Sequence, residues 1–218
     1  NTGTSALHVA LKALGVHDGD LVAIPSYTFI ATANAVRMSG ADPWLFDIDR
    51  ESWGLDPELL TTELARLTEM RDGYPWHKQL GRRVAAVVAV CAAGHPPKLN
   101  ELTAISAATE LPLLLDAAGA MAATYGDQAL GFAVEHAVLS FNGNKTFTAG
   151  GGGAFFTQSE SVANFARHLS TTARTGTDYS HDMQGFNYRI TNMQAAVGCA
   201  QLEQADAFLT RKRAIDAA

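Results

Sequence analysis

The amino-acid sequence predicts an α/β protein in which helices cover both faces of a mostly parallel β-sheet. Short runs that are almost purely apolar, such as residues 84–90, have the β-branched and alanine-rich composition of strands buried on both faces. Stretches with helical patterning alternate with these runs, which is the order of parallel strand–helix–strand units. The chain has 218 residues, 47% of them hydrophobic, so it can bury a substantial core.

The expected elements follow one another along the chain. Thr4 or Ser5 can cap the first helix, and Gly15 suits its left-handed end. Asp56 and Pro57 have the order of a cap and a first helical residue, so another helix starts there. The strands are expected at 21–24, 43–48, 84–90 and 111–115, in a run that ends at 139, and at 154–156. The helices are expected at 6–14, 30–38, 57–68, 98–110 and 159–169, and as one long amphipathic helix over 192–213. Trp76 and the turn at 73–75 are assigned to loops.

Charge and composition exclude several classes of protein. Lysine and arginine number 16 against 22 acidic residues, a net charge of −6, and no dense basic cluster could follow a phosphate backbone, so nucleic acid is not an expected partner. No apolar run approaches the roughly 18 residues that span a bilayer, and the N-terminus lacks a secretory pattern, so no membrane partner is expected. No His, Cys or carboxylate spacing resembles a metal site. Cys91 and Cys199 are expected to be reduced core residues of a cytoplasmic protein.

A lysine follows one of the predicted strands. The strand ends at Leu139 and is followed by Ser-Phe-Asn-Gly-Asn and Lys145, and then by four glycines at 150–153. Open α/β sheets bind ligands at the carboxyl ends of their strands, so Lys145 is the candidate for the chemistry. The glycines let the backbone bend sharply or approach a ligand closely. The alternative is a solvated lysine in a flexible turn.

Two other features are expected near the same edge of the sheet. Gly3, Thr4 and Ser5 stand at a helix N-terminus, where N–H groups and the helix dipole favour a phosphate, although an ordinary helix cap has the same sequence. Asp116 ends an apolar strand, where an ionised carboxylate is costly unless a cation partners it; the alternative is a turn-forming aspartate. A phosphate cup, an acid and an amine are what pyridoxal phosphate requires for its phosphate, ring nitrogen and aldehyde.

Six motifs cover nearly the whole chain. They are Gly-Thr-Ser-Ala-Leu, Pro-Ser-Tyr-Thr-Phe-Ile-Ala-Thr, Asp-Ala-Ala, Ser-Phe-Asn-Gly-Asn-Lys, Gly-Phe-Asn-Tyr-Arg and Gln-Ala-Ala-Val-Gly-Cys-Ala-Gln-Leu-Glu. In this order they resemble the sugar aminotransferases of the DegT/DnrJ/EryC1/StrS family, of the fold type I class of pyridoxal-phosphate enzymes. The fourth is most similar to the branch that aminates C4 of UDP-linked 4-keto-6-deoxy-N-acetylhexosamines. The resemblance implies a large domain with a seven-stranded type of sheet, glutamate and a nucleotide sugar as substrates in cell-surface polysaccharide biosynthesis, and a homodimer with shared active sites.

The resemblance also implies the roles of individual residues. Lys145 would be the catalytic residue that holds the aldehyde, and Asp116 would hold the ring nitrogen. Phe29 would stack on the ring, with Tyr27 close by, and Asn187 would reach the phosphate bound by the neighbouring subunit. The residues implied to bind the cofactor are Gly3, Thr4, Phe29, Asp116, Ser140, Lys145 and Asn187. Phe29 could equally be ordinary core, and Asn187 could be a loop residue that satisfies its own turn.

The sequence departs from the family pattern at two places. Gly119 stands where relatives usually carry Gln, His or Glu close to the cofactor. Relatives also continue into a small C-terminal domain, so residues 1–191 are assigned to the cofactor-binding large domain and 192–218 to a helix leading to a domain absent here. The chain is either a fragment or a natural truncation. The open alternatives are a non-catalytic cofactor-binding remnant and an aminotransferase for a C3-keto sugar or an inosose.

Overall fold

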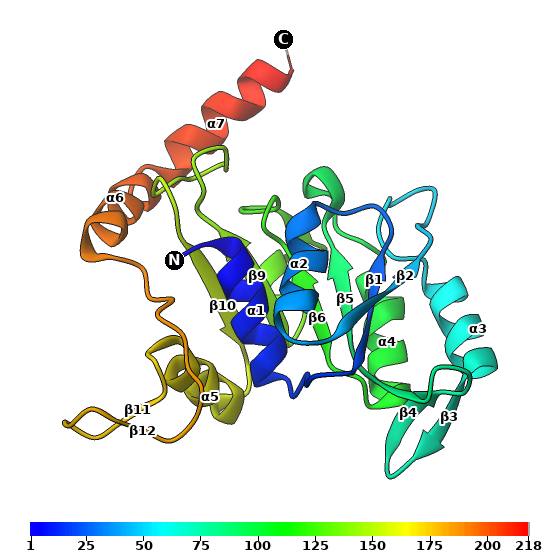
Figure 1. The fold of residues 1–218 in the computed structure, drawn as a ribbon. Helices are drawn as coiled ribbons and strands as arrows, with labels where there is room; N and C mark the ends of the chain where they lie inside the picture. Colours follow the sequence, from blue (N-terminus) through cyan, green and yellow to red (C-terminus); the bar gives the residue numbers. More distant parts are fainter. Residues whose placement is uncertain (218) are drawn as a thin grey trace.

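An eight-stranded mixed sheet forms the centre of the computed structural model, which describes residues 1–217 (Figure 1). Six strands follow the order β10-β9-β6-β5-β1-β2, and the five from β9 to β2 are parallel. At one edge, β10 runs antiparallel to β9. Their bounds are β1 Leu21–Pro25, β2 Asp42–Phe46, β5 Arg82–Val90, β6 Leu113–Asp116, β9 His136–Ser140 and β10 Gly153–Thr157. The predicted mostly parallel sheet is confirmed.

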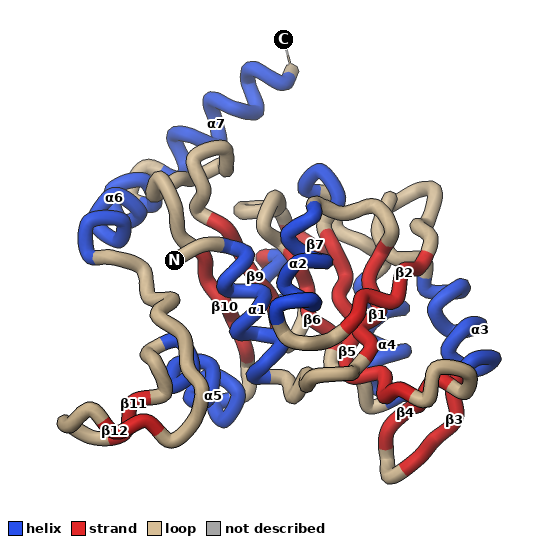
Figure 2. Tube along the Cα trace, in the orientation of Figure 1, coloured by secondary structure: helices blue, strands red, loops and turns tan. Residues whose placement is uncertain are grey.

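Helices pack on both faces of this sheet, as the prediction requires (Figures 1 and 2). On one face lie α1 (Gly3–Ala13) and α2 (Ile30–Met38), and on the other lie α3 (Pro57–Leu67) and α4 (Leu99–Thr109). Each pair closes its own apolar cluster, with Leu7, Leu11 and Val36 on the first side and Leu60, Leu64 and Leu102 on the second. The central strands are therefore buried on both faces, which explains their continuous apolar sequences.

A β-hairpin extends the sheet where loops were expected. It comprises β3 (Thr68–Arg71) and β4 (Tyr74–His77), and β4 pairs with β5 in antiparallel fashion. Asp72 and Gly73, with φ of 51° and 80°, form the two-residue turn, and positive φ at both positions is the geometry that fits the twist of a hairpin. The assignment of Trp76 to a loop was therefore wrong, since it lies in β4.

The helix ends agree with the prediction in part. Asp56 caps α3 by accepting from the N–H groups of Glu58 and Leu59, and Gly15 has the expected positive φ, 84°. The cap of α1 is Thr2, however, and neither Thr4 nor Ser5. Thr2 accepts from the Ser5 N–H while the Ser5 hydroxyl accepts from the Thr2 N–H, which is a reciprocal capping box.

The C-terminal segment extends away from the sheet (Figure 1). The helix expected over 192–213 is two helices, α6 (Asn192–Leu202) and α7 (Ala205–Asp216). Neither contains a buried residue, so no core packing holds the two on one axis. Cys199 of α6 is exposed, which corrects its assignment to the core, whereas Cys91 is buried as expected.

The remaining elements are short, except for α5. They are α5 Glu160–Ser170, the strands β7 Thr124–Tyr125, β8 Gln128–Ala129, β11 Arg174–Thr175 and β12 Ser180–His181, and the 3₁₀ turns Ala92–Gly94 and Leu130–Phe132. Within residues 1–217, no helix combines the length and the apolar character needed to cross a bilayer.

The glycine-rich stretch allows its backbone to lie in direct contact with the backbone at the start of α1. Gly152 forms an isolated bridge with Thr2, just before α1 begins. A Cβ on Gly153 would lie 2.3 Å from the Thr2 carbonyl oxygen and 2.8 Å from the Gly3 nitrogen, and neither backbone atom can rotate away. The absence of a side chain at Gly153 therefore fixes how closely α1 approaches the β9–β10 connection.

We predict that Gly153→Ala lowers the free energy of unfolding by about 1–3 kcal/mol, because an added methyl group in a packed site must displace backbone. Urea denaturation monitored by circular dichroism measures the change. Gly131→Ala is the matched control, since a Cβ there meets no atom within 4 Å, and we expect less than about 0.5 kcal/mol. Equal stabilities of the two variants would contradict this account of the contact.

Candidate active site

A cavity of about 440 Å³ opens at the carboxyl edge of the sheet. The ends of β5, β6 and β9 reach it, as do the N-terminal ends of α1 and α2, so its wall collects residues that are far apart in sequence. Parallel sheets place their ligand sites at this edge. The polar and ionisable residues that line the cavity are Thr2, Thr4, Thr28, Asp116, Ser140, Asn142, Asn144 and Lys145.

Asp116 lies at the end of β6 with only 6% of its surface exposed. Its Oδ2 accepts a hydrogen bond of 2.7 Å from the Thr32 hydroxyl, and its Oδ1 accepts one of 3.1 Å from the Ala118 N–H. Burial raises the pKa of the carboxyl group, while Thr32, Ala118 and the nearby Lys145 ammonium oppose that rise. The carboxylate is therefore costly in this position and would be stabilised by a cation bound in the cavity.

Lys145 lines the same cavity from the loop after β9. The loop is closed by backbone bonds: Phe141 donates to the Gly152 carbonyl, Ala149 to the Phe141 carbonyl, and Lys145 to the Asn142 carbonyl. Lys145 is partly exposed, and its charge lowers the pKa of Asp116. Backbone hydrogen bonds therefore join the two ends of this loop next to β9 and β10, while the Lys145 side chain stays partly exposed.

The N-terminus of α1 forms part of the cavity wall, and Gly3, Thr4 and Ser140 are among the lining residues. A Cβ on Gly3 would lie 2.9 Å from the Ser140 Cβ, so glycine is required for this approach. The first N–H groups of a helix have no intrahelical acceptor, and Thr2 satisfies that of Ser5. Helix N–H groups and the Ser140 hydroxyl, grouped in this way, suit an anion.

The two aromatic residues after β1 behave differently. Phe29 lines the cavity but is 78% exposed, so its ring is not part of the core. Tyr27 packs edge-on against Trp53 at 5.8 Å between ring centroids and does not line the cavity. An exposed aromatic ring at a cavity mouth is available to cover a flat ligand, which agrees with the expected position of Phe29 and excludes the core alternative.

Asn187 is the one predicted binding residue that does not line the cavity. It is exposed, and its carbonyl accepts from the Asn1 side chain. Its neighbours hold the segment on α1, since Tyr188 lies 3.2 Å from the Nδ1 of buried His8 and Phe186 packs on the same imidazole at 4.6 Å between centroids. Burial lowers the pKa of His8, so this contact uses the neutral ring.

Two residues beside the cavity were not among the predicted site residues. Thr32, in the first turn of α2, is 1% exposed and holds Asp116. Thr28, four residues earlier, lines the cavity and lies 2.7 Å from Thr32 between hydroxyl oxygens. No local sequence pattern marks either residue, since only tertiary packing brings Thr32 to Asp116. Gly119 lines the cavity too, and its position leaves space for a side chain, the nearest atom to a Cβ being 3.9 Å away.

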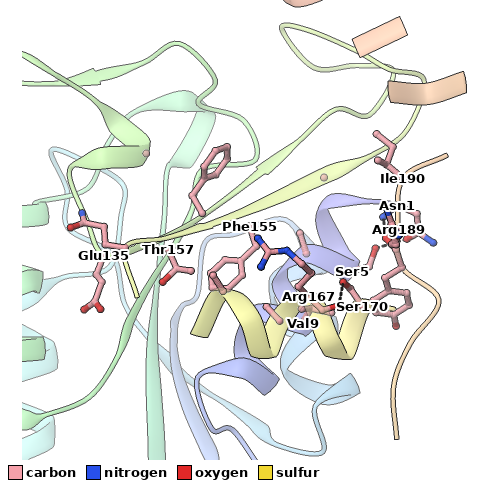
Figure 3. Close-up of a pocket in the computed structure, with 18 of the residues that line it drawn as sticks. Asn1, Ser5, Val9, Glu135, Phe155, Thr157, Arg167, Ser170, Arg189 and Ile190 are labelled. Atoms are coloured by element: carbon pink, nitrogen blue, oxygen red, sulfur yellow. Dashed lines mark hydrogen bonds between the residues drawn. The ribbon is translucent and has the colours of Figure 1, made fainter. Parts of the chain in front are cut away.

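A second cavity, of about 470 Å³, lies along the open edge of β10, between α1, α5 and residues 188–190 (Figure 3). Three charged side chains line it, those of Glu135, Arg167 and Arg189 (Figure 3). None of the residues predicted to bind a cofactor lines this cavity. Within residues 1–217, no cluster of three or more His, Cys, Asp or Glu could hold a metal ion.

Known proteins resemble this chain in sequence and in fold. The model of the DegT/DnrJ/EryC1/StrS aminotransferase family matches residues 1–218. GDP-perosamine synthase of Escherichia coli O157:H7 is 34% identical over 99% of this chain and 55% of its own length. A putative pyridoxal phosphate-dependent aminotransferase of Bacillus subtilis strain 168, EpsN, is 35% identical over 98% of this chain and 53% of its own.

A solved structure supports the same comparison. That of 3-amino-5-hydroxybenzoic acid synthase superimposes with a TM-score of 0.83 at 31% identity, over 95% of this chain and 51% of that one. The chain thus spans about half the length of the relatives that it matches.

Proposed function

This chain belongs to the DegT/DnrJ/EryC1/StrS aminotransferase family, and we propose that the complete protein is a pyridoxal-phosphate-dependent aminotransferase that transfers an amino group from glutamate to a nucleotide-linked keto sugar. The observation that carries the proposal is a single cavity that combines a buried carboxylate, an amine and a helix N-terminus. Residues 1–191 would form its cofactor-binding domain, and the helices after Thr191 would lead to a further domain.

The residues present fit pyridoxal phosphate. Asp116 is a buried carboxylate that a protonated ring nitrogen would stabilise, and its raised pKa reflects the burial that makes such a partner necessary. Gly3, Thr4 and Ser140 would hold the phosphate at the N-terminus of α1. Phe29 would cover the ring from the mouth of the cavity. When bound, the cofactor supplies an electron-accepting ring and an aldehyde that takes up and releases the amino group.

The chain's own residues would perform the proton transfers and the positioning. Lys145 would link the cofactor at rest, and its Nζ, once free, would accept the proton from the substrate carbon and return it on the other side of the reaction. The nearby Asp116 carboxylate would keep a proton on the ring nitrogen. The backbone bonds that close the loop at Phe141 and Ala149 would hold the Nζ within reach of the reacting carbon.

We further propose a homodimer in which Asn187 completes the phosphate site of the partner. Asn187 is exposed and outside its own chain's cavity, while His8 and Tyr188 fix the segment that carries it. The exposed apolar side chains of α6, among them Met193 at 82% and Val197 at 49%, would be covered in the complete assembly.

A second candidate is a protein that binds the cofactor without turnover. The cavity brings together Asp116, Lys145 and the N-terminus of α1, which are the groups that cofactor binding alone requires. In that case, the cofactor would become linked to Lys145, yet no keto sugar would take up the amino group.

We predict that borohydride treatment of the cofactor-loaded protein attaches the cofactor to the peptide that contains Lys145, and that Lys145→Ala and Lys145→Arg abolish the attachment. Arginine keeps the cation but cannot form the bond, so the two variants separate charge from linkage. Mass spectrometry of the digested protein identifies the modified peptide. Lys12→Ala, which changes a lysine of α1 outside the cavity, should retain full attachment; modification persisting in Lys145→Ala would refute the assignment.

We predict that mixing inactive Lys145→Ala protein with inactive Asn187→Ala protein restores activity, to at most about one quarter of the wild-type value per subunit. Half of the dimers in a random mixture would be hybrids, each with one site that has both residues. Activity of the mixture, compared with that of each variant alone, is the measurement. A mixture no more active than its components would argue that each site lies within one chain.

We predict that a UDP-linked 4-keto-6-deoxy-2-acetamido sugar takes up the amino group from complete protein whose cofactor has first received that group from glutamate. The similarity of residues 140–145 to one branch of the family motivates this choice, and the GDP-perosamine synthases among the relatives make GDP-linked keto sugars the first comparison. Return of the cofactor's visible absorbance reports this uptake. If only C3-keto sugars or an inosose took up the amino group, the substrate would belong to the alternative class. The aminotransferase proposal would still hold.

A further inference from the structure

We propose that Thr32 is a positioning residue that holds the Asp116 carboxylate in its charged form and fixed orientation, through a relay of hydroxyl groups that begins at Thr28. The inference rests on the proposed function, in which Asp116 faces the ring nitrogen of the cofactor. Thr32 does not line the cavity, so it would act only through Asp116.

The relay runs from Thr28 in the cavity wall to Asp116, the carboxylate that lines the cavity. Thr28 lies just before α2 and is half-buried in the cavity wall. Its Oγ1 lies 2.7 Å from the Thr32 Oγ1, which in turn lies 2.7 Å from the Asp116 Oδ2. The other carboxylate oxygen accepts from the Ala118 N–H. Both oxygens therefore have a protein donor, which fixes the plane of the carboxylate.

The direction of the relay follows from the number of protons. A hydroxyl group has one proton to donate, and a carboxylate can only accept. The Thr32 proton is therefore committed to Asp116, and Thr28 must be the donor in its contact with Thr32. Thr28 has one alternative acceptor, the Phe29 carbonyl at 3.3 Å, which is the longer and weaker contact.

The other groups that face Asp116 do not replace this donor. Burial and the nearby Asp116 raise the pKa of the Cys91 thiol to about 12, so this weak donor adds no charge beside the carboxylate. The Thr32 hydrogen bond is the largest of the causes that lower the pKa of Asp116. The charge of Lys145 lowers this pKa by less. Removal of the Thr32 hydroxyl would leave Oδ2 without a donor in a buried site, and the carboxyl group would then keep its proton to a higher pH.

The test measures the pKa of Asp116 in cofactor-free chain by ¹³C NMR of the carboxyl carbon, with Asp116→Asn identifying the resonance. We expect Thr32→Val to raise this pKa by about one unit, a tenfold change in the protonation constant, and Thr32→Ser to restore it to within about 0.3 unit. Thr28→Val should raise it in the same direction by less. An unchanged pKa in Thr32→Val, or equal shifts in Thr32→Val and Thr32→Ser, would overturn the proposal.

Two controls keep the result decisive. If Thr32→Val does not fold, as judged by near-UV circular dichroism, the pKa in Thr28→Val decides, because Thr28 is half-buried and outside the core. In the loaded complete protein, Thr32→Val should lower kcat with little change in the KM for the sugar, and Thr32→Ser should recover it. If the wild-type protein bound no cofactor, the proposed function would be refuted. The NMR measurement would still test the effect of Thr32 on Asp116, because it uses cofactor-free chain.

Discussion

The burial of the Asp116 carboxylate is the constraint around which the site is arranged. A charged group at the end of a strand with both faces covered is costly, and the surrounding residues reduce that cost in stages. Thr32 and the Ala118 N–H each satisfy one oxygen, and the Lys145 ammonium adds a favourable charge. The pKa nevertheless stays raised, so the protein alone does not fully compensate. A bound cation would complete the compensation, which relates the stability of this region to occupancy of the cavity.

The parallel sheet makes that arrangement possible. Strands β5, β6 and β9 all end at the same edge, so an acid after one strand and a lysine after another meet without any long-range sequence signal. Helices α2 and α4, which follow β1 and β5, return the chain to the opposite edge of the sheet, and their buried faces stabilise the scaffold. The first turn of α2 also reaches the site through Thr32, so this helix contributes both to stability and to the geometry of the site.

Much of the fold was predictable, because purely apolar strands and capped helices leave strong local signals. The positions of Asp116 and Lys145 followed from the strand ends that precede them. The partner of Asp116 was not predictable, since Thr32 lies 84 residues earlier and only tertiary packing brings the two together. The hairpin turn does have a local signal, the Asp72-Gly73 pair, although only a loop was predicted there. The break between α6 and α7 left none, because no glycine or proline marks it and the segment has no core to fix its course.

The backbone crossing at Thr2, Gly3 and Gly153 has a consequence for the geometry of recognition. The start of α1 touches Ser140 on one side and the β9–β10 connection on the other, and no side chain intervenes at Gly3 or Gly153. The same connection carries Lys145. The separation between the N-terminus of α1 and the loop that carries Lys145 is thus set by the backbone contacts at Gly153 and by the Ser140 Cβ, and none of these atoms can move by a change of rotamer. A ligand held at both ends must match a fixed length, so this part of the cavity would discriminate between ligands by size before any polar contact does.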